Sequence, residues 1–474
     1  MPDERAPLAQ LRRHADGALS RAAGAPLVGG NDVRLLEDAR ENYPRWLDAI
    51  RSARDHVHFE NYFVQDDAIG REFADALGAK AREGVPVRLI YDWLGSFAKS
   101  SRGFWRDLRA AGVEVRCYNP PRLSSPLAMF SRDHRKTLVT DNEVGFVAGL
   151  CVGGAWIGDP IRGIEPWRDT GVEIRGPAVA DIERAFARTW ELCGDPLPEN
   201  AAVPPPAGDV CLRIVSSEPS TAGMLRLDQL IAALARKRLW LTDAYFNGTT
   251  LYIQALRAAA KDGVDVRLLV PNTTDIPIIK PFSRASYRTL LEAGVRIFEW
   301  NGAMVHAKTA VADGLWARVG STNLNVASWF GNCELDAVVE DSAFGARMEE
   351  MYLRDLGNAT EIVLDERCKV RAPGRPARAG GRAGRSRGAG GRVAAGAVRI
   401  GRTVGAALTD RRVLGSVESR LAIVAGLLIC ALAALVAFFP CALAYPAAAV
   451  GAWIGLALLW RGFKLRRMRK ERPR

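Results

Sequence analysis

Two hydrophobic patterns alternate along residues 41–118. In one, apolar side chains recur at helical spacing, as Trp46 and Ile50 do; in the other, β-branched and aromatic residues form short runs between glycines or polar residues. The first pattern predicts helices and the second predicts strands, in this order: helix 41–53, strand 56–63, helix 69–83, strand 85–92, helix 103–111 and strand 113–118. Strands that alternate with helices in this way predict an α/β layered domain.

The same order of elements recurs later in the chain. Residues 263–270 (Gly-Val-Asp-Val-Arg-Leu-Leu-Val) echo residues 84–91 (Gly-Val-Pro-Val-Arg-Leu-Ile-Tyr), and a proline-rich stretch at 196–208 separates the two copies. This repeat predicts an internal duplication with halves at residues 28–203 and 204–366. Two α/β units that face each other would bring equivalent residues into one cleft.

The C-terminal part has a different hydrophobic pattern. Residues 421–439 and 441–460 are two runs without a charged side chain, separated by Pro440. Each run is close to the ~20 apolar residues that a bilayer-spanning helix needs. Arginine and lysine flank both outer ends, which places both ends in the cytoplasm by the positive-inside rule. We therefore expect a transmembrane or re-entrant helical hairpin over residues 420–460 and a basic cytoplasmic tail over 461–474, with a buried soluble hairpin as the alternative.

Charge is divided unevenly along the chain. The net charge is +12, but residues 367–474 carry 22 basic and three acidic side chains, a net of +19, which leaves −7 for residues 1–366. Residues 371–392 are almost entirely glycine, alanine and arginine, so residues 367–419 are expected to form a disordered basic linker. A nuclease would more often carry its positive charge around the active site, so the acidic residues 1–366 argue against that function.

The N-terminus and the cysteines bear on the targeting of the protein and on the redox state of its thiols. Residues 1–27 are rich in alanine and arginine and are expected to form an arm; they lack the apolar core of a signal peptide. The eight cysteines include no Cys-x-x-Cys pair and have no histidine at zinc spacing, which favours reduced, buried thiols.

Two matching motifs stand 172 positions apart, in equivalent places of the two copies. Each reads His-x-Lys-x4-Asp, and their residues are His134, Lys136 and Asp141 in the first copy and His306, Lys308 and Asp313 in the second. In a strand, side chains alternate between faces, so the histidine and lysine share one face. Each aspartate lies at a hairpin turn and off that face, so we expect it to stabilise the fold. The returning strand brings back Gly149 in the first copy and Ser321 and Asn323 in the second.

These side chains suit the chemistry of a phosphodiester. A neutral imidazole can attack phosphorus, and a protonated imidazole can deliver a proton to the leaving oxygen. Lysines neutralise the non-bridging oxygens as charge develops, and Ser321 and Asn323 can donate further hydrogen bonds. No cluster of carboxylates has metal-binding spacing, so no metal or other cofactor is implied. His56 and His58 share a strand face with Glu60, and ordinary hydrogen bonds are favoured for them over a part in the site.

The paired motifs resemble the phospholipase D superfamily. Trp167-Arg168-Asp169-Thr170, Arg175-Gly176-Pro177 and Gly320-Ser321-Thr322-Asn323 are similar to its bacterial cardiolipin synthase branch, over roughly residues 30–365. The resemblance implies two duplicated phospholipase D-like α/β/α sandwich halves that share one active-site cleft.

The resemblance also implies roles for single residues. His134 would form the phosphohistidine, and His306 would act as the acid and then as the base for the acceptor alcohol. A carboxylate from a later strand would orient each histidine, Asp169 for His134 and Glu334 for His306. The sequence departs from the cardiolipin synthase pattern at Cys151, which aligns with Asn323 and removes one donor from the first half-site.

The function favoured by the sequence is a membrane-bound phosphatidyltransferase that makes cardiolipin and glycerol from two phosphatidylglycerol molecules. Its partners would be phospholipids and the membrane, with no nucleic acid expected, and its catalytic body would lie on the cytoplasmic side of the inner membrane. One alternative is a phospholipase D that transfers to water and yields phosphatidic acid. A superfamily nuclease is opposed by the acidic body and the apolar runs. A non-catalytic membrane scaffold is opposed by the intact histidine and lysine of both motifs.

Overall fold

The computed structural model describes residues 16–121, 131–198, 202–276, 279–364, 370–371, 452–453 and 456. A compact unit formed by residues 1–118 and 131–383 holds both copies of the repeat. Residues 370–371 of the expected disordered linker form a short strand that pairs with residues 363–364; the rest of that linker and the basic tail lie outside the described residues, and so does the expected hairpin at 420–460 apart from residues 452–453 and 456. Within the described ranges, no helix has the length and apolar character needed to cross a bilayer.

The first copy of the repeat folds into a sheet with helices between its strands. Its elements are β1 (Val28–Glu37), α2 (Asp38–Ser52), β2 (Val57–Asn61), α3 (Ala68–Arg82), β3 (Val87–Asp92), α4 (Trp93–Ser96), α5 (Arg102–Ala110), β4 (Glu114–Tyr118), β5 (Lys136–Thr140), β6 (Val144–Ala148), the 3-10 helix η2 (Gly154–Trp156), β7 (Thr170–Arg175) and α6 (Val179–Cys193).

The second copy has the same order of elements. These are β8 (Val210–Ser217), α7 (Gly223–Leu234), β9 (Arg238–Thr242), α8 (Thr250–Lys261), β10 (Asp265–Pro271), α9 (Ile279–Leu291), β11 (Arg296–Trp300), β12 (Thr309–Ala312), β13 (Trp316–Gly320), α10 (Val326–Phe330), β14 (Glu334–Glu340), α11 (Ser342–Leu356), β15 (Ala359–Leu364) and β16 (Val370–Arg371).

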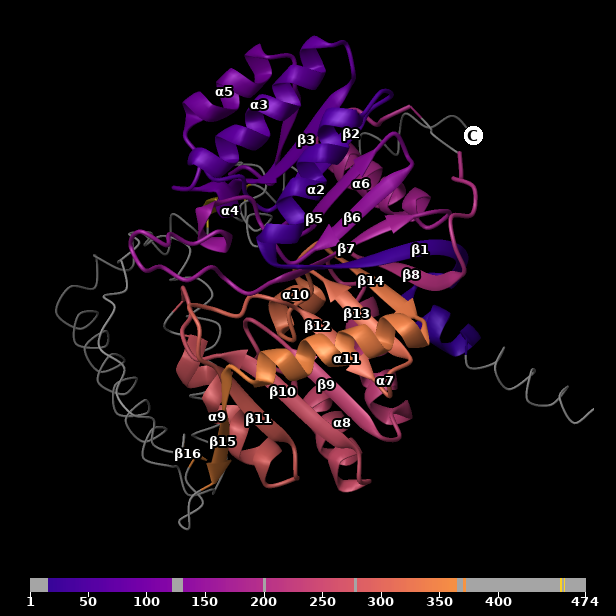
Figure 1. Ribbon diagram of the computed structural model, residues 1–474, viewed down its shortest axis with the longest axis vertical. Helices are drawn as coiled ribbons and strands as arrows, with labels where there is room; N and C mark the ends of the chain where they lie inside the picture. The colour runs from indigo at the N-terminus through magenta and orange to yellow at the C-terminus, as the bar shows by residue number, and fades with distance from the viewer. Residues whose placement is uncertain are drawn as a thin grey trace, which may run out of the picture. The chain divides into compact units, whose positions relative to one another are not determined.

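The strands join into one mixed sheet whose order reflects the duplication (Figure 1). Within the described part of the chain, the sheet has 16 strands in the order β16-β15-β11-β10-β9-β12-β13-β14-β8-β1-β7-β6-β5-β2-β3-β4. Outward from the central β8–β1 pair, β14-β13-β12-β9-β10-β11 on one side matches β7-β6-β5-β2-β3-β4 on the other. In each half the last three strands are parallel and the others antiparallel. The predicted duplication of an α/β unit is confirmed.

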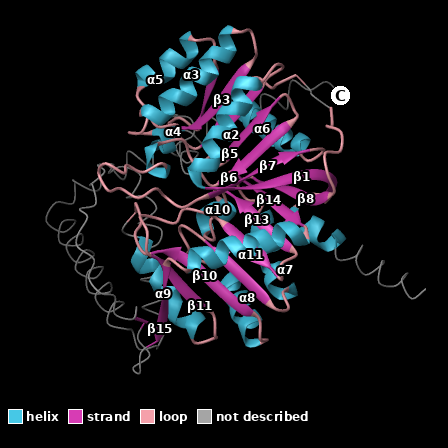
Figure 2. Cartoon of the chain, in the orientation of Figure 1, coloured by secondary structure: helices cyan, strands magenta, loops and turns pink. Residues whose placement is uncertain are grey.

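Helices lie on both faces of the sheet (Figure 2), and alternating side chains of the strands pack against them. In the first half, Leu138 and Phe146 belong to a core formed with α2, α3 and α5. Their neighbours Val139 and Val147 point the other way, into a core formed with α6 and α11. Helices α7, α8 and α9 cover the second half. Each half is therefore an α/β/α sandwich, as expected.

Residues 16–27, which the sequence assigns to an N-terminal arm, pack into the core of the second half. Leu19, Ala23 and Ala25 are buried there with residues of α7. The Nε atom of Arg226 donates a hydrogen bond to the carbonyl of Ala22, 3.1 Å away. The described part of this segment, which directly precedes the first half, therefore packs against the second half.

The motif aspartates hold the hairpin turns that follow β5 and β12. Asp141 and Asp313 both have positive φ angles, 58° and 52°. The carboxylate of Asp141 accepts hydrogen bonds from the backbone N–H groups of three consecutive residues, Arg54, Asp55 and His56. Asp313 binds Arg236, Lys237 and Arg238 in the same way, each at 2.8 Å. Each aspartate therefore fastens its turn to the start of the neighbouring strand, as the sequence predicts.

Replacing Asp313 with asparagine is expected to lower the free energy of unfolding by about 2 kcal/mol at neutral pH, the scale of hydrogen bonds to a charged group. Burial opposes ionisation of Asp313, but the three backbone N–H groups outweigh it and lower its pKa. A lowered folded-state pKa stabilises the protein fully above the unfolded pKa of about 3.9. The contribution is lost as the pH falls through the folded pKa, so the two proteins should converge in acid.

Urea unfolding at neutral and acid pH measures this difference. Asparagine tolerates the positive φ angle, so the substitution tests the charge rather than the turn. Exposed Asp262, at the end of α8, provides the matched control, Asp262→Asn. An equal loss for Asp313→Asn at both pH values would contradict the role given to the ionised carboxylate.

Candidate active site

The two motif histidines lie immediately before their strands. The sequence interpretation placed each histidine inside a strand, but β5 begins at Lys136 and β12 begins at Thr309. The backbone N–H of His134 instead donates to the carbonyl of Cys333 at 2.9 Å, and that of His306 donates to Arg168 at 2.7 Å. Each histidine segment therefore pairs with the other half of the chain.

This backbone pairing brings each histidine to the carboxylate of the opposite half. The Nδ1 atom of His134 lies 2.9 Å from Oε2 of Glu334, and Nδ1 of His306 lies 2.7 Å from Oδ2 of Asp169. The expected pairing of Asp169 with His134 and of Glu334 with His306 is wrong. The reason is that Cys333 and Arg168, the backbone partners of the histidines, directly precede Glu334 and Asp169 in the chain.

Each carboxylate is held ionised beside its histidine. Burial opposes ionisation of Asp169, but the charges and hydrogen bonds of His306 and Lys308 outweigh it and lower its pKa. The pKa of Glu334 is lowered in the same way by His134 and Lys136 against burial. An ionised carboxylate at Nδ1 favours the tautomer with a proton on that nitrogen. The Nε2 atom of His134 is then available for chemistry, whereas Nε2 of His306 lies 3.0 Å from Nζ of Lys308.

The two lysines place both motifs in one electrostatic environment. Each ammonium group hydrogen-bonds the backbone carbonyl of the histidine two residues before it. Burial lowers the pKa of Lys308 to about 8, against the carboxylate of Asp169. Lys308 contributes to a lowered pKa of His134, and Lys136 contributes to a lowered pKa of His306. The two motifs therefore form one site.

Burial favours the neutral form of both imidazoles. For His306, burial and the adjacent Lys308 together lower the pKa to about 3, against the opposing effect of Asp169. Burial also lowers the pKa of His134. An anionic phosphodiester between the two lysines would offset this positive charge and favour protonation of one histidine.

The predicted small and polar residues surround the carboxylates. A Cβ on Gly149 would lie 2.2 Å from Oδ1 of Asp169, so only glycine leaves room for that carboxylate. The hydroxyl of Ser321 accepts from the backbone N–H of Leu335 at 3.0 Å, beside Glu334. Asn323 is buried, and its Oδ1 atom has no hydrogen-bond partner among the residues that the structure describes. Cys151 is buried, and burial raises the pKa of its thiol. The nearby ammonium groups of Lys136 and Lys308 act in the opposite direction.

An aromatic wall around the histidines was missed from the sequence. The ring of Tyr62 meets His134 edge-on at 4.9 Å, and the ring of Tyr245 meets His306 edge-on at 5.9 Å. Trp156 donates its indole N–H to Oδ2 of Asp169 at 2.8 Å, and Trp167 lies 5.6 Å from His306. The sequence does contain a signal, because Tyr62 and Tyr245 follow the equivalent strands β2 and β9.

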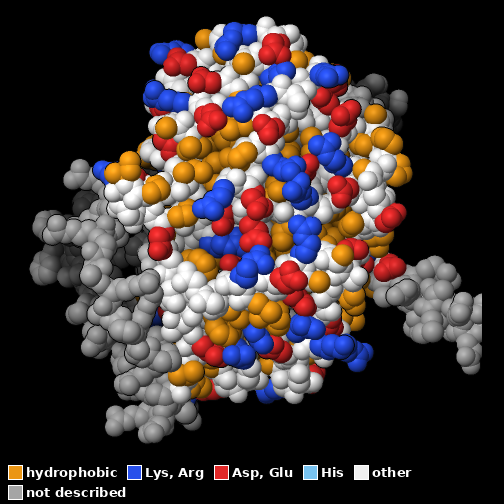
Figure 3. All heavy atoms as spheres, viewed as in Figure 1, with side chains coloured by type: hydrophobic (Ala, Val, Ile, Leu, Met, Phe, Trp, Pro, Cys, Tyr) orange, Lys and Arg blue, Asp and Glu red, His pale blue; other side chains and the backbone are white. Residues whose placement is uncertain are grey.

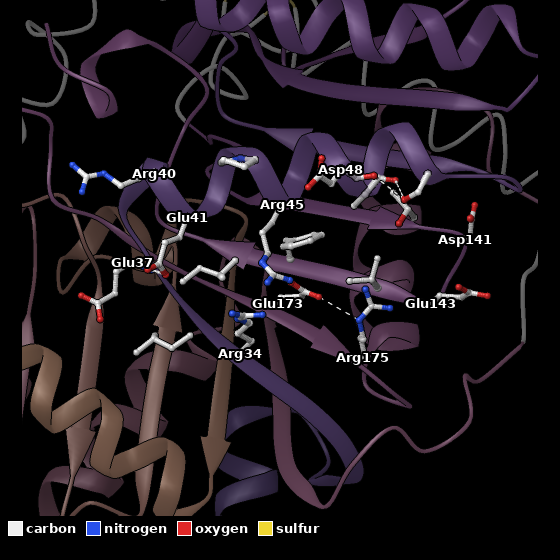
Figure 4. A pocket seen from close by; sticks show the side chains of 18 of the residues that line it. Arg34, Glu37, Arg40, Glu41, Arg45, Asp48, Asp141, Glu143, Glu173 and Arg175 are labelled. Atoms are coloured by element: carbon white, nitrogen blue, oxygen red, sulfur yellow. Dashed lines mark hydrogen bonds and ion pairs between the residues drawn. The ribbon is translucent and has the colours of Figure 1, made fainter.

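A large surface hollow lies away from the histidines. Its volume is about 1350 Å³, and it is lined by residues of α2, β1, β6 and β7 but by neither motif histidine nor motif lysine. Figure 4 shows Glu173 at its centre, where it pairs with Arg45 at 3.0 Å and with Arg175 at 3.2 Å. Basic and acidic side chains also alternate over the face shown in Figure 3, without one basic patch. This face and the hollow give no support to a nucleic-acid interface.

Known proteins are similar to this chain in both sequence and fold. A family model described as "Cardiolipin synthase, PLD-like domain" matches residues 46–190 and 228–356. A cardiolipin synthase of Halalkalibacterium halodurans is 32% identical over 375 residues, which cover 74% of this chain and 74% of that protein. Cardiolipin synthase A of Pseudomonas aeruginosa is 34% identical over 364 residues, 75% of this chain and 73% of that protein.

A solved structure supports the fold assignment. The phosphatidylserine synthase of Haemophilus influenzae superimposes with a TM-score of 0.57 at 15% sequence identity, over 73% of this chain and 92% of that one. At this identity the similarity shows the fold alone.

Proposed function

The chain belongs to the family of cardiolipin synthases with a PLD-like domain, and from this premise we propose that it transfers a phosphatidyl group between two phospholipids. Two phosphatidylglycerol molecules would yield cardiolipin and glycerol. The observation that carries the proposal is the crossed site, in which each half supplies a histidine and lysine and the opposite half supplies the carboxylate. Such a site provides a nucleophile and a proton donor that face one phosphodiester.

In the first step, Nε2 of His134 attacks the phosphorus of the donor lipid. The P–O bond to the head-group glycerol breaks, and protonated His306 gives its proton to the departing oxygen. The products are a phosphatidyl-histidine and free glycerol. Lys136 and Lys308 neutralise the non-bridging oxygens, and each carboxylate stabilises the positive charge on its histidine.

In the second step, neutral His306 removes the proton from a hydroxyl of the acceptor phosphatidylglycerol. The resulting oxygen attacks phosphorus, the P–N bond breaks, and His134 is regenerated. The buried Oδ1 atom of Asn323 could accept a hydrogen bond from an acceptor hydroxyl, since it has no partner among the described residues. Ser321 lies beside the same carboxylate as His134 and would add a donor for the phosphate.

The proposed place of the reaction is the cytoplasmic face of the inner membrane. The apolar runs at 421–439 and 441–460 support attachment. A short hairpin between Gly158 and Trp167, directly before Asp169, supports membrane contact beside the site. Its tip residue Ile161 is 98% exposed, and its backbone N–H is held by the carboxylate of Asp159 at 3.1 Å. Ile164 of the same hairpin is also 51% exposed, so the two side chains form an exposed apolar group that suits the interface of a bilayer.

The test is a product analysis in vesicles of labelled phosphatidylglycerol. Labelled cardiolipin and free glycerol in equal amounts are expected, with the protein recovered on the vesicles. Phosphatidic acid without cardiolipin would identify a hydrolase and direct attention to Cys151, which replaces the usual asparagine. A protein that stays free of the vesicles would contradict the proposed membrane contact.

A further inference from the structure

A buried cluster of two histidines and a glutamate lies toward the opposite end of β2 from Lys136 of the active site. His56 directly precedes β2, His58 lies within it, and Glu183 lies on α6. The side chains are 8%, 5% and 8% exposed. One nitrogen of each ring and one carboxylate oxygen all lie within 4.8 Å of one another.

These contacts are short, yet they lack hydrogen-bond geometry. Oε1 of Glu183 lies 3.1 Å from Nε2 of His56 and 2.6 Å from Nδ1 of His58. Both nitrogens, and Oε2 of Glu183, are nevertheless buried atoms without a properly directed hydrogen-bond partner among the described residues. Ligand atoms around one tetrahedral zinc ion lie roughly 3.3 Å apart, as bonds of ~2.0 Å imply. The spacing of the three side chains is compatible with such a set of donors.

The surroundings orient the rings for this role. Asp55 lies 2.9 Å from Nδ1 of His56. With its proton on that nitrogen, the ring would present the Nε2 lone pair to a bound ion. A carboxylate on the second nitrogen is the usual support of a metal-bound histidine. The ring of His58 stacks on Phe186, with centroids 4.5 Å apart and an angle of 7°.

One neighbour acts against metal binding. Nη1 of Arg88 lies 3.2 Å from Nε2 of His58, which carries a proton when Nδ1 binds a metal. The guanidinium has another partner, because its Nε atom lies 3.3 Å from Glu114. Metal binding therefore requires Arg88 to move toward Glu114.

The second half shows what the same position looks like without these ligands. Asp141 donates its backbone N–H to the carbonyl of His56, and Asp313 does the same to Arg238, which makes His56 and Arg238 equivalent. Arg238 forms a permanent ion pair with Glu349 of α11 at 3.1 Å. Trp240, two residues later, stands where the first half has His58. One half thus joins strand to helix with a fixed charge, and the other uses three metal-binding side chains.

We propose that His56, His58 and Glu183 bind one divalent transition-metal ion of the zinc class, which fastens β2 to α6. Two imidazoles and a carboxylate suit zinc, cobalt or nickel, and Oε2 of Glu183 or a water completes the coordination. The ion would be structural. The proposed ligand His58 pairs with Val139, whereas Lys136 of the active site pairs with Asn61. Three residues of strand separate the two pairs, about 10 Å.

The experiment uses the full-length protein, stripped with a chelator and dialysed against zinc or cobalt. We expect one equivalent of metal per chain by elemental analysis, a tetrahedral cobalt absorption spectrum, and a zinc-dependent rise in melting temperature. His56→Arg should bind metal more than ~100-fold more weakly, since it removes a ligand. It should keep the fold, because it copies the Arg238–Glu349 pair of the second half.

Two further variants complete the design. Glu183→Gln keeps the side-chain shape and should also lose the metal. This variant therefore tests the proposal even if His56→Arg does not fold. His134→Ala removes an active-site histidine and should keep the full equivalent. Equal metal content and spectra in the wild type and both cluster variants would overturn the proposal. Loss of metal in His134→Ala would overturn it as well, by placing the ion in the active site.

Discussion

Replacing His134 with alanine is expected to lower the rate of phosphatidyl transfer at least ~10⁴-fold, because the phosphorus then has no nucleophile to attack it. The remaining lysines and His306 would still bind the phosphodiester, so lipid binding should change little. The measurement is the initial rate of cardiolipin formation in vesicles of labelled phosphatidylglycerol. Protein quenched in denaturant at neutral pH, which preserves the acid-labile P–N bond, and probed for the phosphatidyl label reports the covalent intermediate.

His306→Ala separates the two histidines. It should also lose transfer, by about 10²- to 10⁴-fold, since it removes the proton donor and not the nucleophile. A substrate with a nitrophenolate leaving group needs no proton, so His306→Ala should still form the phosphatidyl-histidine from it, whereas His134→Ala should not. Covalent label in His134→Ala and none in His306→Ala would reverse the assignment of the nucleophile.

The hydrophobic pattern was sufficient to predict the duplicated fold, because each copy carries its own periodic signal. The helix predicted at 103–111 matches α5, and the strand at 113–118 contains β4. The motif turns could also be predicted, since Asp313-Gly314 is a strong local turn signal. Local spacing determines these features, so they can be read from one stretch of sequence at a time.

Features that depend on how the halves meet could not be predicted in this way. Period-two alternation shows which face of a strand a side chain occupies, but not which half of the protein lies opposite. His134 meets Glu334 because the backbones of Asp133 and Cys333 form a bridge 200 positions apart in the chain. The burial of Leu19 against α7 has the same cause, since no local pattern shows that residues 16–27 cover the second half. The role of Glu183 beside His56 and His58 also needed the packing of α6 on β2.

A second large effect on the transfer rate is expected from replacing the carboxylate that each half supplies to the histidine of the other half. This effect depends on the leaving group of the substrate. Glu334→Gln should slow formation of the phosphatidyl-histidine by about 10³-fold, because a neutral amide no longer fixes the Nδ1–H tautomer of His134 or stabilises its positive charge. Asp169→Asn should slow transfer from phosphatidylglycerol to a similar degree, but through His306. With the natural lipid the two variants are therefore expected to have similar rates of phosphatidyl transfer.

A nitrophenyl phosphodiester separates them, because its leaving group departs without the proton that His306 supplies. Asp169→Asn should form the covalent intermediate from this substrate at close to the wild-type rate, and should then accumulate it because His306 is a poor base for the acceptor. Glu334→Gln should remain slow, since the attacking ring is the one affected. Pairing within each half would exchange these two outcomes. Rapid-quench measurement of labelled protein in both variants therefore tests whether each half of the chain completes the histidine of the other.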